Sequence, residues 1–113
     1  MTSASWKRTE RDIAEKDYAQ QVYDLARYYH WRCYHTHDSR HSPAGYPDLS
    51  MVHGRRHVYA EIKAEKGKLA PEQRAWLVAL YEAGHEVFVW RPSYWWQVAD
   101  VLSGVYVTSR SDR

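Results

Sequence analysis

The chain has 113 residues, of which 44% are hydrophobic and 27% are charged, so it suits one compact domain and leaves little for a second. Its formal net charge is only +2, so any binding of nucleic acid must come from a local cluster of basic residues rather than from bulk charge. Cys33 is the single cysteine, which excludes an intrachain disulfide, and no apolar run reaches the length of a membrane span or a signal peptide. These features predict a soluble intracellular protein without a membrane partner.

Residues 1–9 are polar and lack periodicity, so we expect a flexible N-terminal arm. A helix is predicted over residues 10–30, because apolar residues recur there at helical spacing: Tyr18, Val22, Leu25 and Tyr29. Glu15 lies at the edge of that apolar face. It is either a metal ligand that points toward a later segment or a first-turn acid that complements the helix dipole. Three other acids compete for the same role: Glu10, Asp12 and Asp17.

A short strand is predicted over residues 31–36, followed by a loop at residues 37–46 that is rich in His, Ser, Pro and Gly. Loops carry binding and catalytic residues more often than packed elements do. Zinc is a competing interpretation of the histidines in this region, which are His35, His37 and His41. Their spacings match no common structural zinc pattern, and only Cys33 could add sulfur nearby.

Two alternating runs flank Gly54 and Arg55 and predict a β-hairpin. A Gly-X pair suits the two-residue loop of a type II′ turn, which fixes the pairing of the strands. Met51 should lie opposite Val58, Leu49 opposite Ala60, and Asp48 opposite Glu61. Leu49 and Met51 then share one face of the first strand, while Asp48 and Ser50 share the other.

This register places two carboxylates against each other, with Lys63 on the same face as Glu61. Directly opposed like charges destabilise a sheet, so a cation should lie between Asp48 and Glu61. Lys63 supplies one positive charge, and a hard divalent ion such as Mg²⁺, which prefers carboxylate oxygens, could supply more. Such an ion activates water and stabilises a phosphate in the transition state, while the lysine orients the nucleophile or helps to deprotonate it. The alternative is a surface hairpin whose charges form a solvated ion pair.

The second half of the chain begins with a polar turn at residues 64–68. A helix is predicted from Pro71 to about residue 83, then a buried strand at residues 86–90, a short helix capped by Ser93, and a C-terminal tail at residues 105–113. Gln73 shares a face with apolar residues of its helix, so its amide should find a polar partner. The order of elements over residues 10–104 predicts one α/β domain with a mixed central sheet.

Two segments, GYPDLSMV and YAEIKAEKGKLAPEQRAWLVALYEAGHEVFVWRPS, resemble the VRR-NUC domain of the PD-(D/E)XK nuclease superfamily. The resemblance runs from about residue 15 to residue 93. It implies a restriction-endonuclease-like α/β/α sandwich and an Mg²⁺ or Mn²⁺ cofactor. The metal ligands that it implies are Glu15, Asp48, Glu61 and the backbone carbonyl of Ile62. The catalytic residues that it implies are Asp48, Glu61, Lys63 and Gln73. Ala70 departs from the serine or threonine often found there in the family, and alanine is a poor N-cap.

The resemblance also implies that a His-Thr-X-Asp-Ser-Arg stretch contacts the phosphate backbone of DNA through His35, Asp38, Ser39 and Arg40. A wider set of basic residues surrounds the candidate site: Arg27, Arg32, Arg40, Arg55, Arg56, Lys63, Lys66 and Lys68. From this set we add Arg55, Lys66 and Lys68 to the predicted DNA contacts. The alternative is an ordinary solvated face.

The main hypothesis is a metal-dependent endonuclease that acts on DNA, with branched structures such as four-way junctions as candidate substrates and no small-molecule cofactor. Stand-alone members of this family look like dimeric resolvases. Because one small domain makes a shallow site, and a two-fold pair would present two cuts to a symmetric substrate, we expect a homodimer. By the same resemblance it would act in the cytoplasm of a bacterium or a phage-infected host cell. The alternatives are a nucleic-acid-binding module that keeps the fold but needs a partner to cut, and a structural protein with an incidental Glu-X-Lys.

Overall fold

The computed structural model describes residues 13–36 and 42–104; the predicted arm, the first residues of the predicted opening helix and the predicted tail lie outside these ranges. The elements in chain order are α2 (Glu15–Tyr28), β1 (Arg32–His35), β2 (Leu49–His53), β3 (Arg56–Ile62), α3 (Pro71–Glu82), β4 (Glu86–Trp90), the 3-10 helix η1 (Pro92–Tyr94) and α4 (Trp95–Ser103). None of the helices in the described ranges has the length and apolar character needed to cross a membrane.

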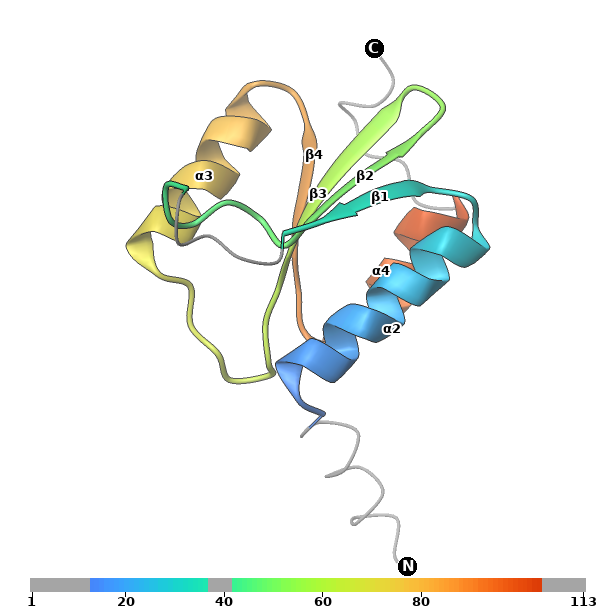
Figure 1. Ribbon diagram of the computed structural model, residues 1–113, viewed down its shortest axis with the longest axis horizontal. Helices are drawn as coiled ribbons and strands as arrows, with labels where there is room; N and C mark the ends of the chain where they lie inside the picture. Colours follow the sequence, from blue (N-terminus) through green and yellow to red (C-terminus); the bar gives the residue numbers. More distant parts are fainter. Residues whose placement is uncertain (1–12, 37–41, 105–113) are drawn as a thin grey trace, which may run out of the picture.

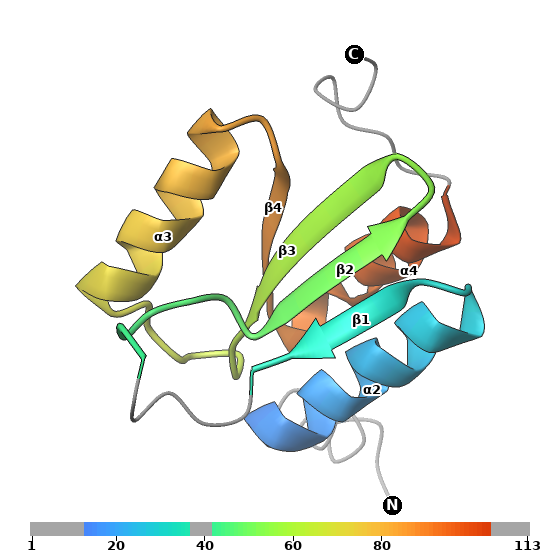
Figure 2. The same ribbon diagram turned by 45° about the horizontal axis from the view of Figure 1, so that its top comes forward.

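The four strands form one mixed sheet in the order β1-β2-β3-β4. The pairs β1–β2 and β2–β3 are antiparallel, whereas β3 and β4 are parallel and are connected through α3. Helices α2 and α4 lie on one side of the sheet and α3 lies on the other (Figures 1 and 2). The predicted α/β/α sandwich with a mixed central sheet is therefore confirmed.

The hairpin has the predicted register, with Leu49 paired to Ala60 and Met51 paired to Val58. Gly54 adopts a φ of 60°, and Arg55 is not among the residues of positive φ. A left-handed first loop position followed by an ordinary second one is the requirement of a type II′ turn. Continuing the pairing by one step places Asp48 opposite Glu61, as the alternation predicted.

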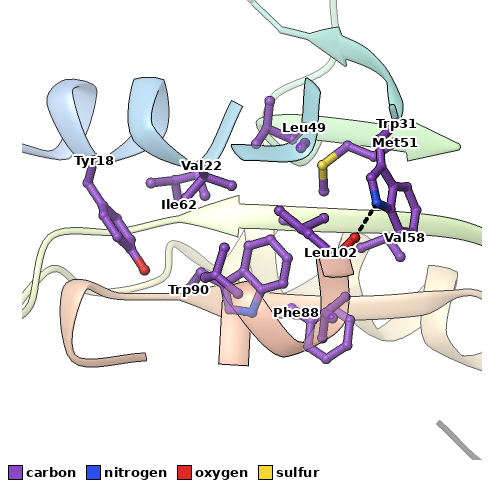
Figure 3. Close-up of a cluster of buried hydrophobic side chains, with 14 residues drawn as sticks. Tyr18, Val22, Trp31, Leu49, Met51, Val58, Ile62, Phe88, Trp90 and Leu102 are labelled. Atoms are coloured by element: carbon purple, nitrogen blue, oxygen red, sulfur yellow. Dashed lines mark hydrogen bonds between the residues drawn. The ribbon is translucent and has the colours of Figure 1, made fainter. Parts of the chain in front are cut away.

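The hydrophobic core lies between the sheet and the helices α2 and α4 (Figure 3). Strand β3 contributes the buried side chains of Val58, Ala60 and Ile62, which alternate with residues that face α3. The indole Nε1 of Trp31 donates a hydrogen bond to the carbonyl of Leu102 at 2.8 Å and so joins β1 to α4. Burying one large apolar side chain contributes roughly 1.5–3 kcal/mol, so a one-residue slip of β3 would expose this whole set and is strongly disfavoured.

Three predicted helix limits were wrong. Helix α2 begins at Glu15, because Ala14 is extended, with φ of −62° and ψ of 146°, so residues 13 and 14 are not helical as predicted; it ends at Tyr28 rather than at residue 30. Ser93 does not cap the last helix, which begins at Trp95. The backbone N–H and the hydroxyl of Ser93 instead donate to the carboxylate of Glu65 at 2.9 and 2.7 Å. The hydroxyl of Ser93 is thus hydrogen-bonded to the charged carboxylate of Glu65 and does not cap the helix.

Candidate active site

Asp48 and Glu61 meet where β2 begins and β3 ends. The carboxylate Oδ2 of Asp48 accepts a hydrogen bond from the backbone N–H of Ile62 at 2.8 Å, so this side chain reaches across to the neighbouring strand. The backbone before it is fastened as well, because Thr36 donates its N–H to the carbonyl of Asp48 at 2.9 Å and its hydroxyl to the carbonyl of Pro47 at 3.1 Å. Asp48 is therefore held in place by both of its neighbouring strands.

Glu61 is almost completely buried, with 2% of its surface exposed. Its Oε2 accepts a hydrogen bond from Nε2 of Gln73 at 2.9 Å, while its Oε1 is buried without a hydrogen-bond partner in the described part of the protein. Oε1 of Gln73 accepts the backbone N–H of Ala70 at 2.8 Å, which fixes the orientation of the amide. The polar partner predicted for Gln73 is thus Glu61, and the same side chain makes one half of a capping box by accepting the backbone N–H of the N-cap residue Ala70.

The pKa of Glu61 is raised to about 8. Burial is the largest cause, followed by the neighbouring carboxyl of Asp48, which repels a second negative charge and can share a proton with Glu61. Lys63 opposes the rise, and Glu15 adds to it. Without a further cation, the ionised form of Glu61 is therefore poorly compensated at neutral pH.

Glu15 lies across a cavity from Asp48. The cavity has a volume of about 320 Å³ and is lined by Glu15, Lys16, Ala19, Gln20, Tyr23, His35, Asp48 and Ile62. Among residues 13–36 and 42–104, no three His, Cys, Asp or Glu side chains are grouped closely enough to hold a metal ion. The structure thus joins Asp48 to Glu61 and brings Glu15 and Ile62 to the same cavity. A buried carboxylate oxygen without a donor, beside a second carboxylate, fits a hard divalent cation.

The segment that follows Lys63 is fastened by Arg91. The backbone N–H of Lys63 donates to the carbonyl of Trp90 at 3.0 Å, and Nη1 of Arg91 donates to the carbonyls of Ala64 and Gly67 at 3.0 and 2.5 Å. The hydroxyl of Tyr18 in turn donates to the carbonyl of Arg91 at 2.7 Å. Arg91 therefore connects helix α2, which carries Glu15, with the turn that follows Lys63.

Comparison with protein-family models identifies this arrangement. The model of the VRR-NUC domain matches residues 5–93, which is most of the chain. The chain belongs to the VRR-NUC domain family. This is a PD-(D/E)XK-like nuclease family, so the protein carries a nuclease-type domain, which implies a DNA substrate, and the family generally uses divalent metals. The searches of curated proteins and of solved structures give no significant match.

The VRR-NUC fold brings some of the predicted DNA contacts to the site. His35 lines the cavity, and Lys66 and Lys68 are exposed in the turn after Lys63. Arg55 lies at the tip of the hairpin, seven residues along β3 from Ile62, which corresponds to about 23 Å. The structure therefore does not bring Arg55 to the carboxylates. The remaining residues of that prediction and of the zinc interpretation lie outside the described residues: His37, Asp38, Ser39, Arg40 and His41.

Sequence reasoning missed two parts of the VRR-NUC site. The first is the wall of the cavity formed by α2, where Lys16, Ala19, Gln20 and Tyr23 follow Glu15. Helical spacing from Glu15 could have found Ala19 and Tyr23, because positions four and eight residues on lie on the same face. The second is Arg91, whose contacts are 24 and 27 positions away in the sequence. No local pattern marks such a contact.

Proposed function

We propose that this VRR-NUC domain is an Mg²⁺- or Mn²⁺-dependent endonuclease that hydrolyses phosphodiester bonds of DNA in the cytoplasm. The observation that carries the proposal is Oε1 of Glu61, a buried carboxylate oxygen without a hydrogen-bond partner among the described residues, next to the carboxyl of Asp48. Leaving such a group unpaired costs stability, and a structural role does not require it. A divalent cation satisfies both carboxylates at once.

The residues divide the work in the following way. Asp48 and Glu61 would hold the ion, and the carbonyl of Ile62 and the carboxylate of Glu15, which line the adjoining cavity, would be further ligands once Glu15 moves toward the ion. When bound, the ion lowers the pKa of water and offsets the charge that develops on the phosphate. The side chain of Lys63 would orient the attacking nucleophile as an ammonium or, as the neutral amine, accept its proton. Gln73 positions Glu61 through the hydrogen bond to Oε2.

The experiment is a cleavage assay with Mn²⁺ on linear, flapped and four-way DNA. Wild type should cleave at least one of these substrates, and both Lys63→Ala and Glu61→Gln should not. Glu82→Gln is the matched control, because Glu82 is an exposed acid at the end of α3 and its loss should leave cleavage unchanged. If wild type leaves the DNA intact, or if wild type and Lys63→Ala cleave it equally, the endonuclease proposal is overturned. If the protein binds DNA without cutting it, the binding module is the better description.

We also propose that the substrate is branched DNA and that the active form is a homodimer. Exposed aromatic side chains support an interface, since Tyr94 at the end of η1 and Trp95 and Trp96 at the start of α4 are 44%, 38% and 58% exposed. Light scattering should give twice the mass of the chain, and Trp96→Ser should lower it. Val78→Ser, at an exposed apolar position on α3, is the control. A monomeric mass for the wild type at the concentration of the cleavage assay would refute the dimer.

A further inference from the structure

Two cavities follow one another from the candidate active site along α2. Helix α2 lies beside the edge strand β1 (Figure 2). The first part is the cavity that Glu15 and Asp48 line. The second part is a shallower cavity of about 550 Å³, lined by Tyr23, Arg27, His30, Trp31, Arg32 and Cys33. Tyr23 lines both cavities, so the two parts are neighbours on either side of this residue. We call the two parts together the α2–β1 groove.

The helical repeat explains why one groove collects these side chains. Lys16, Gln20, Tyr23 and Arg27 are separated by four, three and four residues, so they lie on one face of α2. From Glu15 to Arg27 the helix rises by about 18 Å, at roughly 1.5 Å per residue. The groove is therefore long enough for several consecutive nucleotides.

The charge of the groove changes along its length. Carboxylates of Glu15 and Asp48 lie at one end, and the basic residues Lys16, Arg27 and Arg32 follow in the lining along α2 and β1. All three basic residues are exposed. The ion pair formed within the described ranges is that of Arg56 with Glu86, so no carboxylate of these ranges neutralises Lys16, Arg27 or Arg32. The basic part of the groove is thus available to a polyanion.

Aromatic rings lie among these charges. The guanidinium of Arg27 lies 5.7 Å from the centroid of the Tyr23 ring, and the rings of Tyr23 and His35 are 6.4 Å apart. Basic residues that alternate with aromatic rings are typical of surfaces that bind a single nucleic-acid strand, where phosphates meet the cations and bases stack on the rings.

We propose that the α2–β1 groove binds the DNA strand that flanks the scissile phosphate, with Arg27 and Arg32 as phosphate contacts and Tyr23 as a stacking surface. This assignment rests on the proposed nuclease function for the position of the scissile phosphate, which would lie at the carboxylate end. It selects Arg27 and Arg32 from the basic residues that surround the site and adds the ring of Tyr23.

The first test measures binding without cleavage. Affinity for a short fluorescent single strand is followed by anisotropy in EDTA between about 50 and 200 mM KCl, for wild type, Arg27→Gln, Arg32→Gln and the double variant. Each phosphate contact contributes about 0.7 to the salt slope on a single strand, so over this range wild type should lose about sevenfold more affinity than the double variant. Arg74→Gln, at an exposed position on α3 across the sheet, is the matched control and should keep the wild-type slope.

The second test uses cleavage of a flapped substrate with Mn²⁺. Loss of phosphate contacts outside the reacting centre should raise KM several-fold and leave kcat unchanged. Tyr23→Leu should raise KM as well, whereas Tyr23→Phe should resemble wild type because the ring is retained. Equal thermal midpoints for wild type and variants would exclude a folding defect, because the substituted side chains are exposed or half-buried.

The outcomes separate this assignment from the endonuclease proposal. If wild type cleaves DNA and the double variant has the same salt slope and KM, the groove assignment is overturned and the endonuclease stands. If no variant cleaves but the double variant loses the predicted salt slope, the endonuclease fails and the groove assignment stands. Equal loss of slope in Arg74→Gln would show a bulk charge effect and overturn the assignment. A change of mass in light scattering for the double variant would show that the groove joins two copies of the chain, which also overturns it.

Discussion

The two buried carboxylates of the described sheet differ in how their charge is met. Glu86 is 5% exposed, and both of its oxygens accept from Arg56, at 2.9 Å from Nε and at 2.7 Å from Nη2. Glu61 is 2% exposed, and only one of its oxygens has a partner, the neutral amide of Gln73. Burial of a charge is tolerated when an opposite charge and hydrogen bonds accompany it. Glu86 meets that condition within the chain, and Glu61 does not.

The two arginines nearby make the same contrast. Arg56 uses its remaining Nη1 on the carbonyl of Val101 at 3.2 Å and lies 5.2 Å from the ring centroid of Trp31, so all of its contacts hold the fold together. Arg91, at the other end of β4, donates to backbone carbonyls of the turn after Lys63 rather than to Glu61. The chain therefore has an arginine at each end of β4, and only one of them neutralises a buried glutamate.

The lesson is that a buried acid indicates function only when its compensation is missing. Glu86 points to the core side of the sheet with Val58, its partner in the register, while Glu61 points to the α3 side. Both side chains are buried. What separates them is that one carboxylate oxygen of Glu61 accepts no hydrogen bond from the described residues, and the predictions below test whether that difference is functional.

The largest expected effect is on cleavage. Glu61→Gln keeps the shape of the side chain and removes the charge, so we expect the single-turnover rate with Mn²⁺ to fall on the order of 10³-fold, which corresponds to about 4 kcal/mol of lost transition-state stabilisation. Glu86→Gln, assayed at a temperature where it is folded, should cleave within a few-fold of wild type. If both variants lose the same fraction of activity, Glu61 and Glu86 do not differ in function.

The next effect is on stability, where the substitution of Glu86, not that of Glu61, should have the larger effect. Glu86→Gln leaves Arg56 without its counter-charge, and breaking a buried pair costs about 3 kcal/mol in the free energy of unfolding. Urea denaturation measures it. Glu61→Gln, in EDTA, should not lower that free energy, because the buried carboxyl has a pKa raised to about 8 and the amide replaces a group whose ionisation burial opposes. The double variant Arg56→Met with Glu86→Leu should recover most of the loss, since an apolar pair of similar volume replaces the ion pair. A loss below about 0.5 kcal/mol for Glu86→Gln would show that the pair is not structural.

A third effect concerns stabilisation by metal. An ion that binds only the folded state stabilises it by about 2.7 kcal/mol when its concentration is 100-fold above Kd, which raises Tm by roughly 10 °C for a domain of this size. We expect this shift with Mn²⁺ for wild type and Glu86→Gln, and no shift for Glu61→Gln. Differential scanning calorimetry with and without Mn²⁺ measures it, and an equal shift in all three proteins would place the ion elsewhere.

The contrast also shows which parts of the molecule could be predicted from sequence. The hairpin was predictable because its determinants are local: period-two alternation in both strands and Gly54 at a turn position that requires a positive φ. That register was enough to place Asp48 against Glu61. The amide partner of Glu61 was approachable in the same way, since Gln73 is a polar residue on an apolar helix face.

The distant contacts were not predictable. The prediction that Arg56 belongs to the basic cluster around the DNA site was wrong. Arg56 pairs with Glu86, and their side chains are only 17% and 4% exposed. The two residues are 30 positions apart, so no local pattern marks the pair. Spacing alone also could not choose Glu15 over the other acids of its helix. The packing of α2 beside β1 decides that Glu15 faces the cavity, and no pattern within α2 contains that information.

The smallest expected effect is the pH dependence of the α3 side of the sheet. His57 accepts or donates a hydrogen bond with Ser50 at 2.8 Å, and burial, then the nearby His85, lowers its pKa from 6.5. A lowered pKa means that the unfolded chain binds the proton more tightly, so the contribution of neutral His57 is present above pH 6.5 and is lost as the pH falls through the folded pKa. Tyr59 and His85 face the His57 ring, at 4.3 and 5.0 Å between centroids, and no carboxylate of the described residues pairs with it.

The test uses a Glu61→Gln background, which removes the ionisation of that acid. In this background, His57→Gln should flatten the fall in the free energy of unfolding between pH 7 and 5. Glu86→Gln in the same background should leave that slope unchanged, because its effect comes from the broken ion pair; an unchanged slope in His57→Gln would show that the proton is taken up elsewhere.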